Sequence, residues 1–299
     1  MNFKEHKSIP TILLLTVALI WGSTFAIMKD SLGRIDVNSF LAWRFILAAL
    51  IMAALRPRSL RHLNSNFLLR GIAAGLLLGA GYIFQTFGLT LTTVAKTGFI
   101  TGLYAVFTPL IAALFFKHHI SKIQWLAVGL ATVGMGILSL RGLSIGLGEF
   151  LVLVGALFFA LHIIGLSRWS PDRDPYALTM VQMATVGVLC LLASTKSGFH
   201  APHDRGVWAV VIYSAIFASA FAFIVQTWAQ SFMSATSVGI VLTMEYIFAA
   251  IFGIVLVHER LTWRTLVGGL CMMIGLYLVI LFDSPESPVG TDESEKVLP

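Results

Sequence analysis

The sequence is short of charged residues. Asp, Glu, Lys and Arg make up 11% of its 299 residues, whereas hydrophobic residues make up 58%. Soluble domains carry roughly 25% charged residues, because a large exposed apolar surface drives association in water. This composition therefore excludes an ordinary soluble domain and predicts an integral membrane protein.

Several functional signals are also missing. The two cysteines, Cys190 and Cys271, lie inside apolar runs, so no disulfide framework is predicted. No GxxxxGK[ST] loop is present to cradle ATP, and no stripe of basic and aromatic residues indicates nucleic-acid binding. We interpret His200, His203 and Asp204 as part of a solvated loop rather than a metal site. The sequence predicts no enzyme, no cofactor, no metal and no nucleic-acid partner.

What the sequence has instead is a series of apolar runs, each near the 17 to 25 residues or so that a spanning helix needs. Alternating polar and apolar residues of a membrane β-barrel are absent. We therefore predict an all-α protein with ten transmembrane helices. The runs cover residues 10–28, 38–55, 67–88, 96–116, 123–140, 148–167, 176–195, 207–230, 235–257 and 263–282.

The distribution of basic residues predicts the orientation. The strongest basic cluster, residues 56–61, follows the second run, an even number of crossings from Lys4 and Lys7. The positive-inside rule then places both termini in the cytoplasm, across a cell (inner) membrane. Residues 1–9 form the cytoplasmic N-terminus, and residues 283–299 form an acidic tail that we expect to be disordered.

The chain also resembles itself. Gln85 and Thr86 recur as Gln226 and Thr227, 141 residues later, while Trp21 matches Phe159 at an offset of 138. Each copy holds five spans, an odd number, so the second copy would be inverted relative to the first. This favours a transporter architecture with a site between the halves, although a relic of duplication would leave the same pattern. The predicted repeats cover residues 10–142 and 148–282.

Several motifs carry a family resemblance. Residues 21–26 (WGSTFA), Arg44 and residues 248–262, with 108–113 as a first-half counterpart, resemble the EamA-type branch of the drug/metabolite transporter superfamily. Bacterial amino-acid exporters are the most similar members. The resemblance implies a ten-helix exporter whose cavity is built from spans one, three, four, six, eight and nine, with spans five and ten at the periphery. Residues 245–247 lack the proline common in such proteins, which leaves open whether span nine bends.

Polar side chains inside the apolar runs are the candidate site residues, because they are expensive in hydrocarbon and usually face the protein interior. Glu245 would couple protons or bind an ammonium group, or form a structural pair with His162. His162 would donate to a substrate carboxylate, or link helices. Arg44 is interpreted as an anchor that reaches the outer interface. The predicted substrate-binding or cavity-lining residues are Trp21, Thr24, Tyr82, Gln85, Thr101, Tyr104, Phe159, His162, Gln226 and Glu245.

The leading hypothesis is a secondary transporter that exports amino acids, hydrophobic or aromatic ones above all, or similar small metabolites by alternating access. An exporter of a different metabolite or drug is the first alternative, and a membrane-embedded enzyme is the second. The expected partners are a small-molecule substrate and membrane lipid, with the chain acting as a monomer.

Overall fold

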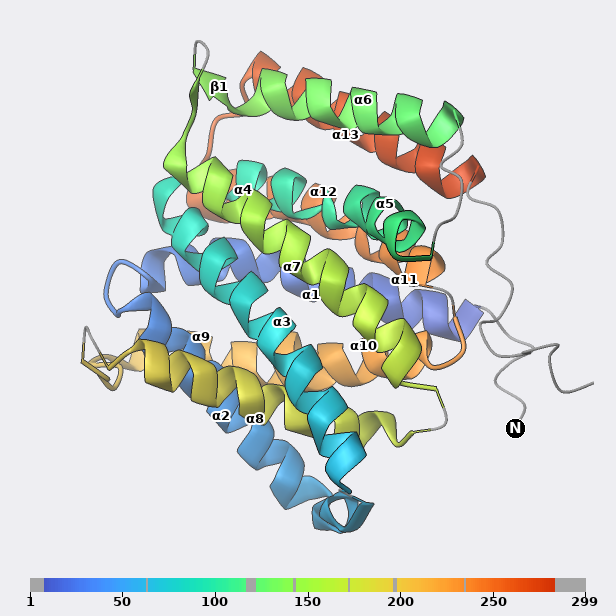
Figure 1. Ribbon diagram of the computed structural model, residues 1–299. Helices are drawn as coiled ribbons and strands as arrows, with labels where there is room; N and C mark the ends of the chain where they lie inside the picture. The colour runs from blue at the N-terminus through green and yellow to red at the C-terminus, as the bar shows by residue number, and fades with distance from the viewer. Residues whose placement is uncertain are drawn as a thin grey trace, which may run out of the picture.

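The computed structural model describes residues 8–62, 64–116, 122–141, 144–171, 173–195, 198–233 and 235–282. The predicted tail, 283–299, and most of the predicted N-terminal segment, 1–9, lie outside these residues. Figure 1 shows an almost entirely helical chain, whose described β-structure is one antiparallel pair of two-residue strands, β1 (Leu140–Arg141) and β2 (Ser144–Ile145).

The helices follow the predicted apolar runs along the chain. The first half contains α1 (Ser8–Ser31), α2 (Val37–Leu55), η1 (Pro57–His62), α3 (Ser65–Leu91), α4 (Val94–Thr101), α5 (Tyr104–Phe116) and α6 (Lys122–Ser139). The second half contains α7 (Leu147–Trp169), α8 (Pro175–Ala193), α9 (Arg205–Tyr213), η2 (Ser214–Phe221), α10 (Ala222–Gln230), α11 (Ala235–Leu242), α12 (Met244–Val257) and α13 (Trp263–Phe282).

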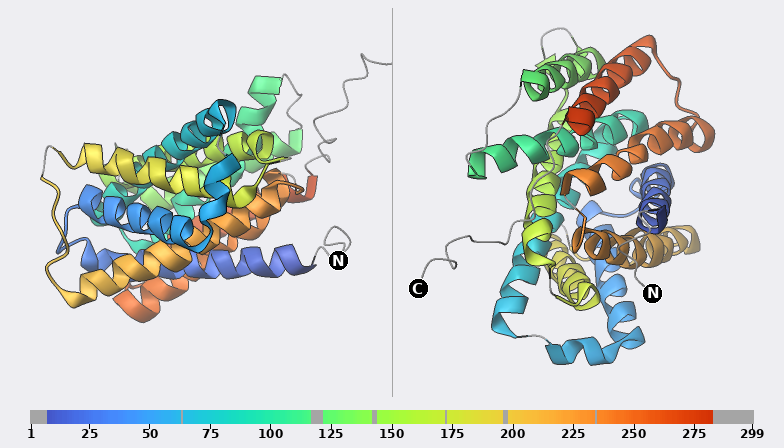
Figure 2. Two further views of the ribbon diagram at one scale, coloured as in Figure 1. Left: turned by 90° about the horizontal axis from the view of Figure 1, so that it is seen from below. Right: turned by 90° about the vertical axis from the view of Figure 1, so that its right-hand side faces the viewer.

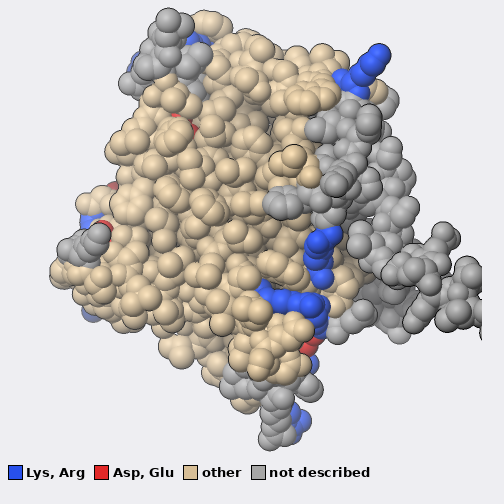
Figure 3. Space-filling model, in the orientation of Figure 1, with Lys and Arg blue, Asp and Glu red and all other residues tan. Residues whose placement is uncertain are grey.

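The helices present apolar surface outward. Among the described residues, seven helical segments are long and apolar enough to cross a membrane, and two further apolar helices are shorter. Large side chains such as Ile12, Leu69, Val188 and Leu270 are exposed, and the face drawn in Figure 3 is uncharged across its middle. A surface of this kind is stable in lipid and not in water. The chain is therefore a multi-pass membrane protein.

Side chains at the predicted turns start several helices. Asp36, Asn64, Thr93, Asp174 and Asp204 each accept a hydrogen bond from a backbone N–H in the first turn of the helix that follows. Such caps satisfy donors that have no partner inside the helix. Asp204 thus belongs to the start of α9, and its bond from the Val207 N–H, helped by the Arg34 charge, lowers the pKa of its carboxyl.

Small residues let the helices approach closely. A Cβ atom added at Gly71, Gly75 or Gly79 of α3 would lie 2.6 to 2.8 Å from side-chain atoms of α8, so this glycine ridge is a packing surface. Helices α6 and α13 pack on each other at one edge of the molecule, as Figure 1 and the right-hand view of Figure 2 show. The expected periphery, the fifth and tenth apolar runs, is confirmed.

Three of the apolar runs predicted from the sequence are interrupted. Helix α4 ends at Thr101 and α5 begins at Tyr104, and in the second half α11 ends at Leu242 and α12 begins at Met244. Span nine therefore breaks at Thr243 without the proline that usually causes a kink. In span eight, η2 is a π-helix between α9 and α10. Broken helices and π-turns inside a membrane protein occur mainly at functional sites.

Candidate functional site

A cavity lies in the centre of the helical bundle, next to these interruptions. The space free of protein atoms among its lining residues is about 540 Å³, open solvent included. All ten residues predicted from the sequence line it: Trp21, Thr24, Tyr82, Gln85, Thr101, Tyr104, Phe159, His162, Gln226 and Glu245. They come from α1, α3, α4, α5, α7, α10 and α12. The structure brings them together, whereas their binding of a substrate stays a prediction.

Seven further residues complete the lining, and sequence reasoning did not select them for the cavity. They are Phe25, Met28, Arg44, Leu78, Ile163, Phe223 and Leu242. The internal repeat held a usable signal for some of them. Phe223 follows Tyr82 by 141 residues, and Leu242 follows Thr101 by the same offset. Applying the offset to each predicted site residue would have found both.

One wall of the cavity is aromatic and centres on Phe223. Its ring centroid lies 5.2 Å from that of Trp21 and 6.1 Å from those of Tyr82 and His162, while Phe159 lies 5.3 Å from Tyr82. The Trp21 indole N–H donates to the Ala218 carbonyl at 2.8 Å and so fixes its ring. These contacts form a stable apolar surface against which a hydrophobic solute group could pack.

The other lining groups include polar atoms with no partner. Gln85 Nε2 donates to Thr101 Oγ1 at 2.9 Å, whereas Gln226 Oε1 and the Tyr104 hydroxyl are buried without a hydrogen bond among the described residues. The Glu245 side chain is 5% exposed and likewise has no hydrogen bond or ion pair within the described part of the chain. Buried polar groups are normally satisfied, so these three are exceptions that a bound solute could satisfy if the cavity widens.

His162 does not pair with Glu245, the structural alternative considered from the sequence. Its Nε2 lies 2.7 Å from Gln182 Oε1, and Gln182 Nε2 donates to the Leu178 carbonyl at 3.3 Å. Because the amide nitrogen is used as a donor, its oxygen faces His162, and His162 Nε2 carries the donated proton. This bond joins α7 to α8 behind the cavity wall.

Arg44 does not reach the membrane interface, and the expectation that it would do so is wrong. Its side chain is 1% exposed and lines the cavity. Helix α8 and the π-helix η2 pack against α2, and they cover the route along which the side chain would have extended. A contact surface of this kind, formed by residues more than 130 positions away, leaves no trace in the local sequence around Arg44.

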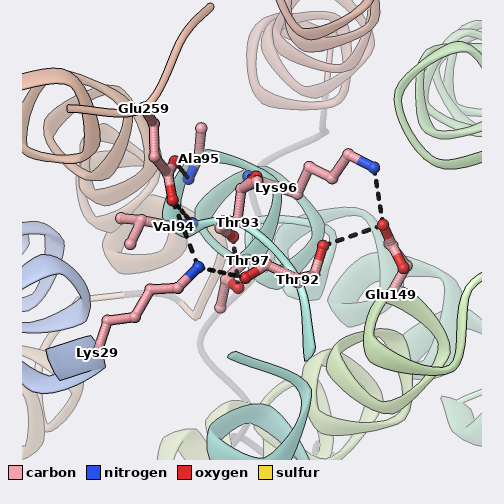
Figure 4. Close-up of polar contacts among 9 residues, drawn as sticks. All are labelled: Lys29, Thr92, Thr93, Val94, Ala95, Lys96, Thr97, Glu149 and Glu259. Carbon is pink, nitrogen blue, oxygen red and sulfur yellow. Dashed lines mark hydrogen bonds and ion pairs between the residues drawn. The ribbon is translucent and has the colours of Figure 1, made fainter. Parts of the chain in front are cut away.

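A second polar cluster closes one end of the bundle (Figure 4). Glu259, just after α12, accepts from the backbone N–H groups of Val94 and Ala95 at 2.7 and 3.2 Å, and pairs with Lys29 of α1 at 3.4 Å. Lys96, in the first turn of α4, pairs with Glu149 of α7 at 2.7 Å. The cluster therefore ties the ends of α1, α4, α7 and α12 together on one face.

We expect Glu259→Ala to destabilise the protein, because it removes the acceptor of two N–H groups in the first turn of α4 and leaves Lys29 without its carboxylate. The loss of two charge-assisted bonds at a side chain that is 13% exposed should lower the free energy of unfolding by about 1–3 kcal/mol. Thermal unfolding of the purified protein in detergent measures this. Asp30→Ala is the matched control, since its pair with Arg34 is exposed and should be worth less than about 1 kcal/mol. Equal losses in the two variants would contradict this role of Glu259.

The fold and the cavity together define a class: a multi-pass helical membrane protein that encloses a mainly apolar cavity with a few unsatisfied polar groups, next to broken helices. Residues 8–140 and 146–281 each match the model of the EamA-like transporter family. The chain belongs to this family, and the resemblance noted from its motifs is confirmed.

Individual relatives agree with the family match. An uncharacterized transporter of Archaeoglobus fulgidus is 31% identical over 269 residues, covering 90% of this chain and 84% of that protein. The uncharacterized transporter YyaM of Bacillus subtilis is 26% identical over 71% of this chain and 74% of its own length. A solved crystal structure superimposes with a TM-score of 0.69 at 15% identity, over 92% of this chain and 98% of that one, which shows a shared fold.

Proposed function

We propose that the protein is a secondary transporter that exports amino acids, chiefly hydrophobic or aromatic ones, or similar small metabolites. The observation that carries this proposal is that one cavity is lined by Gln226 and Tyr104, each with a buried polar atom that has no hydrogen bond among the described residues, by the carboxyl group of Glu245, and by several aromatic rings. A small solute with a polar head and an apolar side chain satisfies both surfaces. Gln85, His162, Gln226 and Glu245 bind its polar ends, while Trp21, Tyr82 and Phe159 contact its side chain.

The proposed architecture is ten spans in two inverted repeats of five, over residues 10–142 and 148–282. Two observations support it. The family model matches the chain twice, once in each half. The helix break at Gly102 in the first half also lies 141 residues before the break at Thr243 in the second. A cavity between inverted halves opens to either side when one half rocks against the other, which is alternating access.

In this arrangement both termini lie in the cytoplasm and the protein lies in the inner membrane. The cluster around Glu259 is then at the outer face, because it joins the C-terminal end of α1 to the ends of three other helices. In Figure 3 Lys and Arg are visible at both ends of the molecule, with the larger areas at the opposite, right-hand end, which the positive-inside rule places in the cytoplasm. The outer ion pairs would hold that face closed and separate when it opens.

The test is export from cells that overproduce the protein. Cells loaded with a panel of dipeptides should release one or more of the resulting amino acids at least about threefold faster than cells producing an inactive variant, and should tolerate a toxic analogue of the same amino acid. The inactive variant is Gly22→Leu, whose side chain would collide with the backbone of α12, since even a Cβ atom at position 22 lies 2.6 Å from the Glu245 carbonyl. Unchanged release and unchanged tolerance for the whole panel would overturn the proposal.

Export of a different metabolite or drug is the second candidate, and the cavity limits its chemistry. Among the described lining residues, Arg44 is the single Lys or Arg. Phosphate esters carry about two negative charges and are usually bound by several cations or by a helix N-terminus. The cavity therefore favours solutes with at most one negative charge.

A further inference from the structure

Arg44 is the largest fully buried side chain of the described residues, and it belongs to the cavity wall. It lies in the second turn of α2, with its guanidinium carbon 4.8 Å from the Tyr82 ring centroid and 4.9 Å from that of Phe45. The two rings also contact each other, with centroids 4.9 Å apart, and an arginine packed against such a pair has few alternative rotamers. Its charge is therefore held at one fixed place.

The hydrogen bonds of Arg44 all go to neutral groups. Nε donates to Ser219 Oγ at 2.7 Å, and Nη2 donates to the Ala218 carbonyl at 3.1 Å and to the Tyr82 hydroxyl at 3.3 Å. Nη1 contacts only the Met28 sulfur, a weak acceptor, at 3.5 Å. Within the described part of the chain no carboxylate pairs with this guanidinium, and one N–H of Nη1 has no acceptor.

The π-helix η2 provides the support for this arrangement. Ala218 and Ser219 both lie in it, and the Ala218 carbonyl accepts from Trp21 as well as from Arg44. A single irregular turn thus fixes a cavity-wall ring and the buried cation together. The Tyr82 hydroxyl accepts from Arg44, and its own proton has no acceptor among the described residues. Arg44 Nη1 and the Tyr82 hydroxyl therefore form a pair of free donors.

The same cavity also contains hydrogen-bond acceptors, on Glu245 and Gln226. Both residues line it, and there Gln226 Oε1 has no hydrogen bond and the Glu245 carboxyl group forms no direct ion pair among the described residues. At the positions of Arg44 and Glu245 the two halves of the internal repeat carry different residues. The residue 138 positions after Arg44 is the neutral Gln182, and the residue 141 positions before Glu245 is the neutral Tyr104. One half supplies the cation and the other half supplies the anion.

We propose that Arg44 is the carboxylate-binding residue of the cavity, and that the transported solutes are zwitterions with one carboxylate and one ammonium group. The solute carboxylate accepts from Arg44 Nη1 and the Tyr82 hydroxyl, while its ammonium group donates to Glu245 and Gln226 Oε1. Arg44 and Glu245 attract each other electrostatically but form no direct ion pair. A buried charge without a close partner is costly, and a zwitterion offers a close partner to both groups at once, which an amine or an acid alone does not. This inference rests on the proposed export function and specifies its substrate class.

The first experiment uses the wild-type protein in liposomes and three solutes with one aromatic body: L-phenylalanine, 2-phenylethylamine and 3-phenylpropionate. Phenylalanine should bind and be transported at least about tenfold better than either partial analogue, since each analogue lacks one charge-assisted contact. Equal or better binding of the amine or of the acid overturns the zwitterion inference and leaves the export function intact. Failure of all three to bind or cross overturns the export function as well.

The second experiment compares Arg44→Lys and Arg44→Gln. Lysine keeps the charge but lacks the planar guanidinium group with its several N–H donors. The Kd for phenylalanine should therefore rise at least about tenfold in Arg44→Lys, and further in Arg44→Gln. The Kd for phenylethylamine should stay within about twofold of the wild-type value, because this solute makes no contact through a carboxylate. An equal loss for both solutes marks a purely structural arginine and overturns the inference.

A third variant is a control for general disruption of the site. Ser219→Ala removes one bond to Arg44 Nε while leaving the cation and its free Nη1 in place. Elution as a single species and a sharp thermal transition identify the folded variants. If Arg44→Gln fails this check, Arg44→Lys and the wild-type panel remain decisive. Ser219→Ala should keep the preference for phenylalanine over phenylethylamine, and loss of that preference would count against Arg44 Nη1 as the binding group.

Discussion

Glu245→Gln should lower transport of amine-bearing solutes at least about tenfold, the loss expected when a buried charge-assisted contact becomes a neutral one. The substitution keeps the size of the side chain and removes only its charge. Glu245 is 5% exposed in the cavity wall and makes no direct hydrogen bond or ion pair with the described residues, so within the protein the substitution removes its longer-range attraction to Arg44. Uptake into vesicles with an imposed pH difference measures both the rate and its dependence on that difference.

The same assay decides whether Glu245 couples transport to protons. A carboxyl group that alternates between two faces of the membrane can carry a proton in one direction and release it for the solute. Any acceleration by the pH difference should then disappear in Glu245→Gln. Asp30→Asn is the matched control, because Asp30 is exposed at the end of α1 and pairs only with Arg34 among the described residues. A variant with normal rate and normal pH dependence would remove Glu245 from both roles.

The helical fold was predictable because its signal is local and strong. Each apolar run is long enough to act as a helix by itself in lipid, so composition and run length placed the helices within a few residues. Asp36 and Asp174, which start α2 and α8, stand just before their runs in the sequence. The cavity residues were predictable for a related reason: a polar side chain in such a run has to face the protein interior.

What the sequence did not determine were the contacts between distant segments. Arg44 and His162 each sit at a readable position, yet their partners, Ser219 and Gln182, follow from how α2 meets η2 and how α7 meets α8. The break at Thr243 lacks a proline, and the π-turn of η2 has no local motif. These features depend on tertiary packing, which decides between nearly equivalent helix geometries.

Phe223→Ala should abolish the preference for large side chains. Phe223 is 2% exposed and contacts Trp21, Tyr82 and His162, so its removal opens the aromatic wall. The Kd for phenylalanine should rise by about 10- to 100-fold, as expected for about 1.5–3 kcal/mol of lost apolar contact, and the Kd for alanine should change much less. Competition binding with the two amino acids measures the ratio directly.

Two further substitutions separate this effect from general destabilisation. Phe223→Leu retains most of the buried volume and should lose less of the preference than Phe223→Ala. Phe150→Ala removes an equal ring from the outward face of α7, where the side chain is 49% exposed, and should leave the phenylalanine-to-alanine ratio unchanged. If the aromatic wall sets selectivity, the phenylalanine-to-alanine ratio should fall most in Phe223→Ala, less in Phe223→Leu and not at all in Phe150→Ala. A Phe223→Ala variant that folds and keeps the wild-type ratio would show that the solute's side chain packs elsewhere.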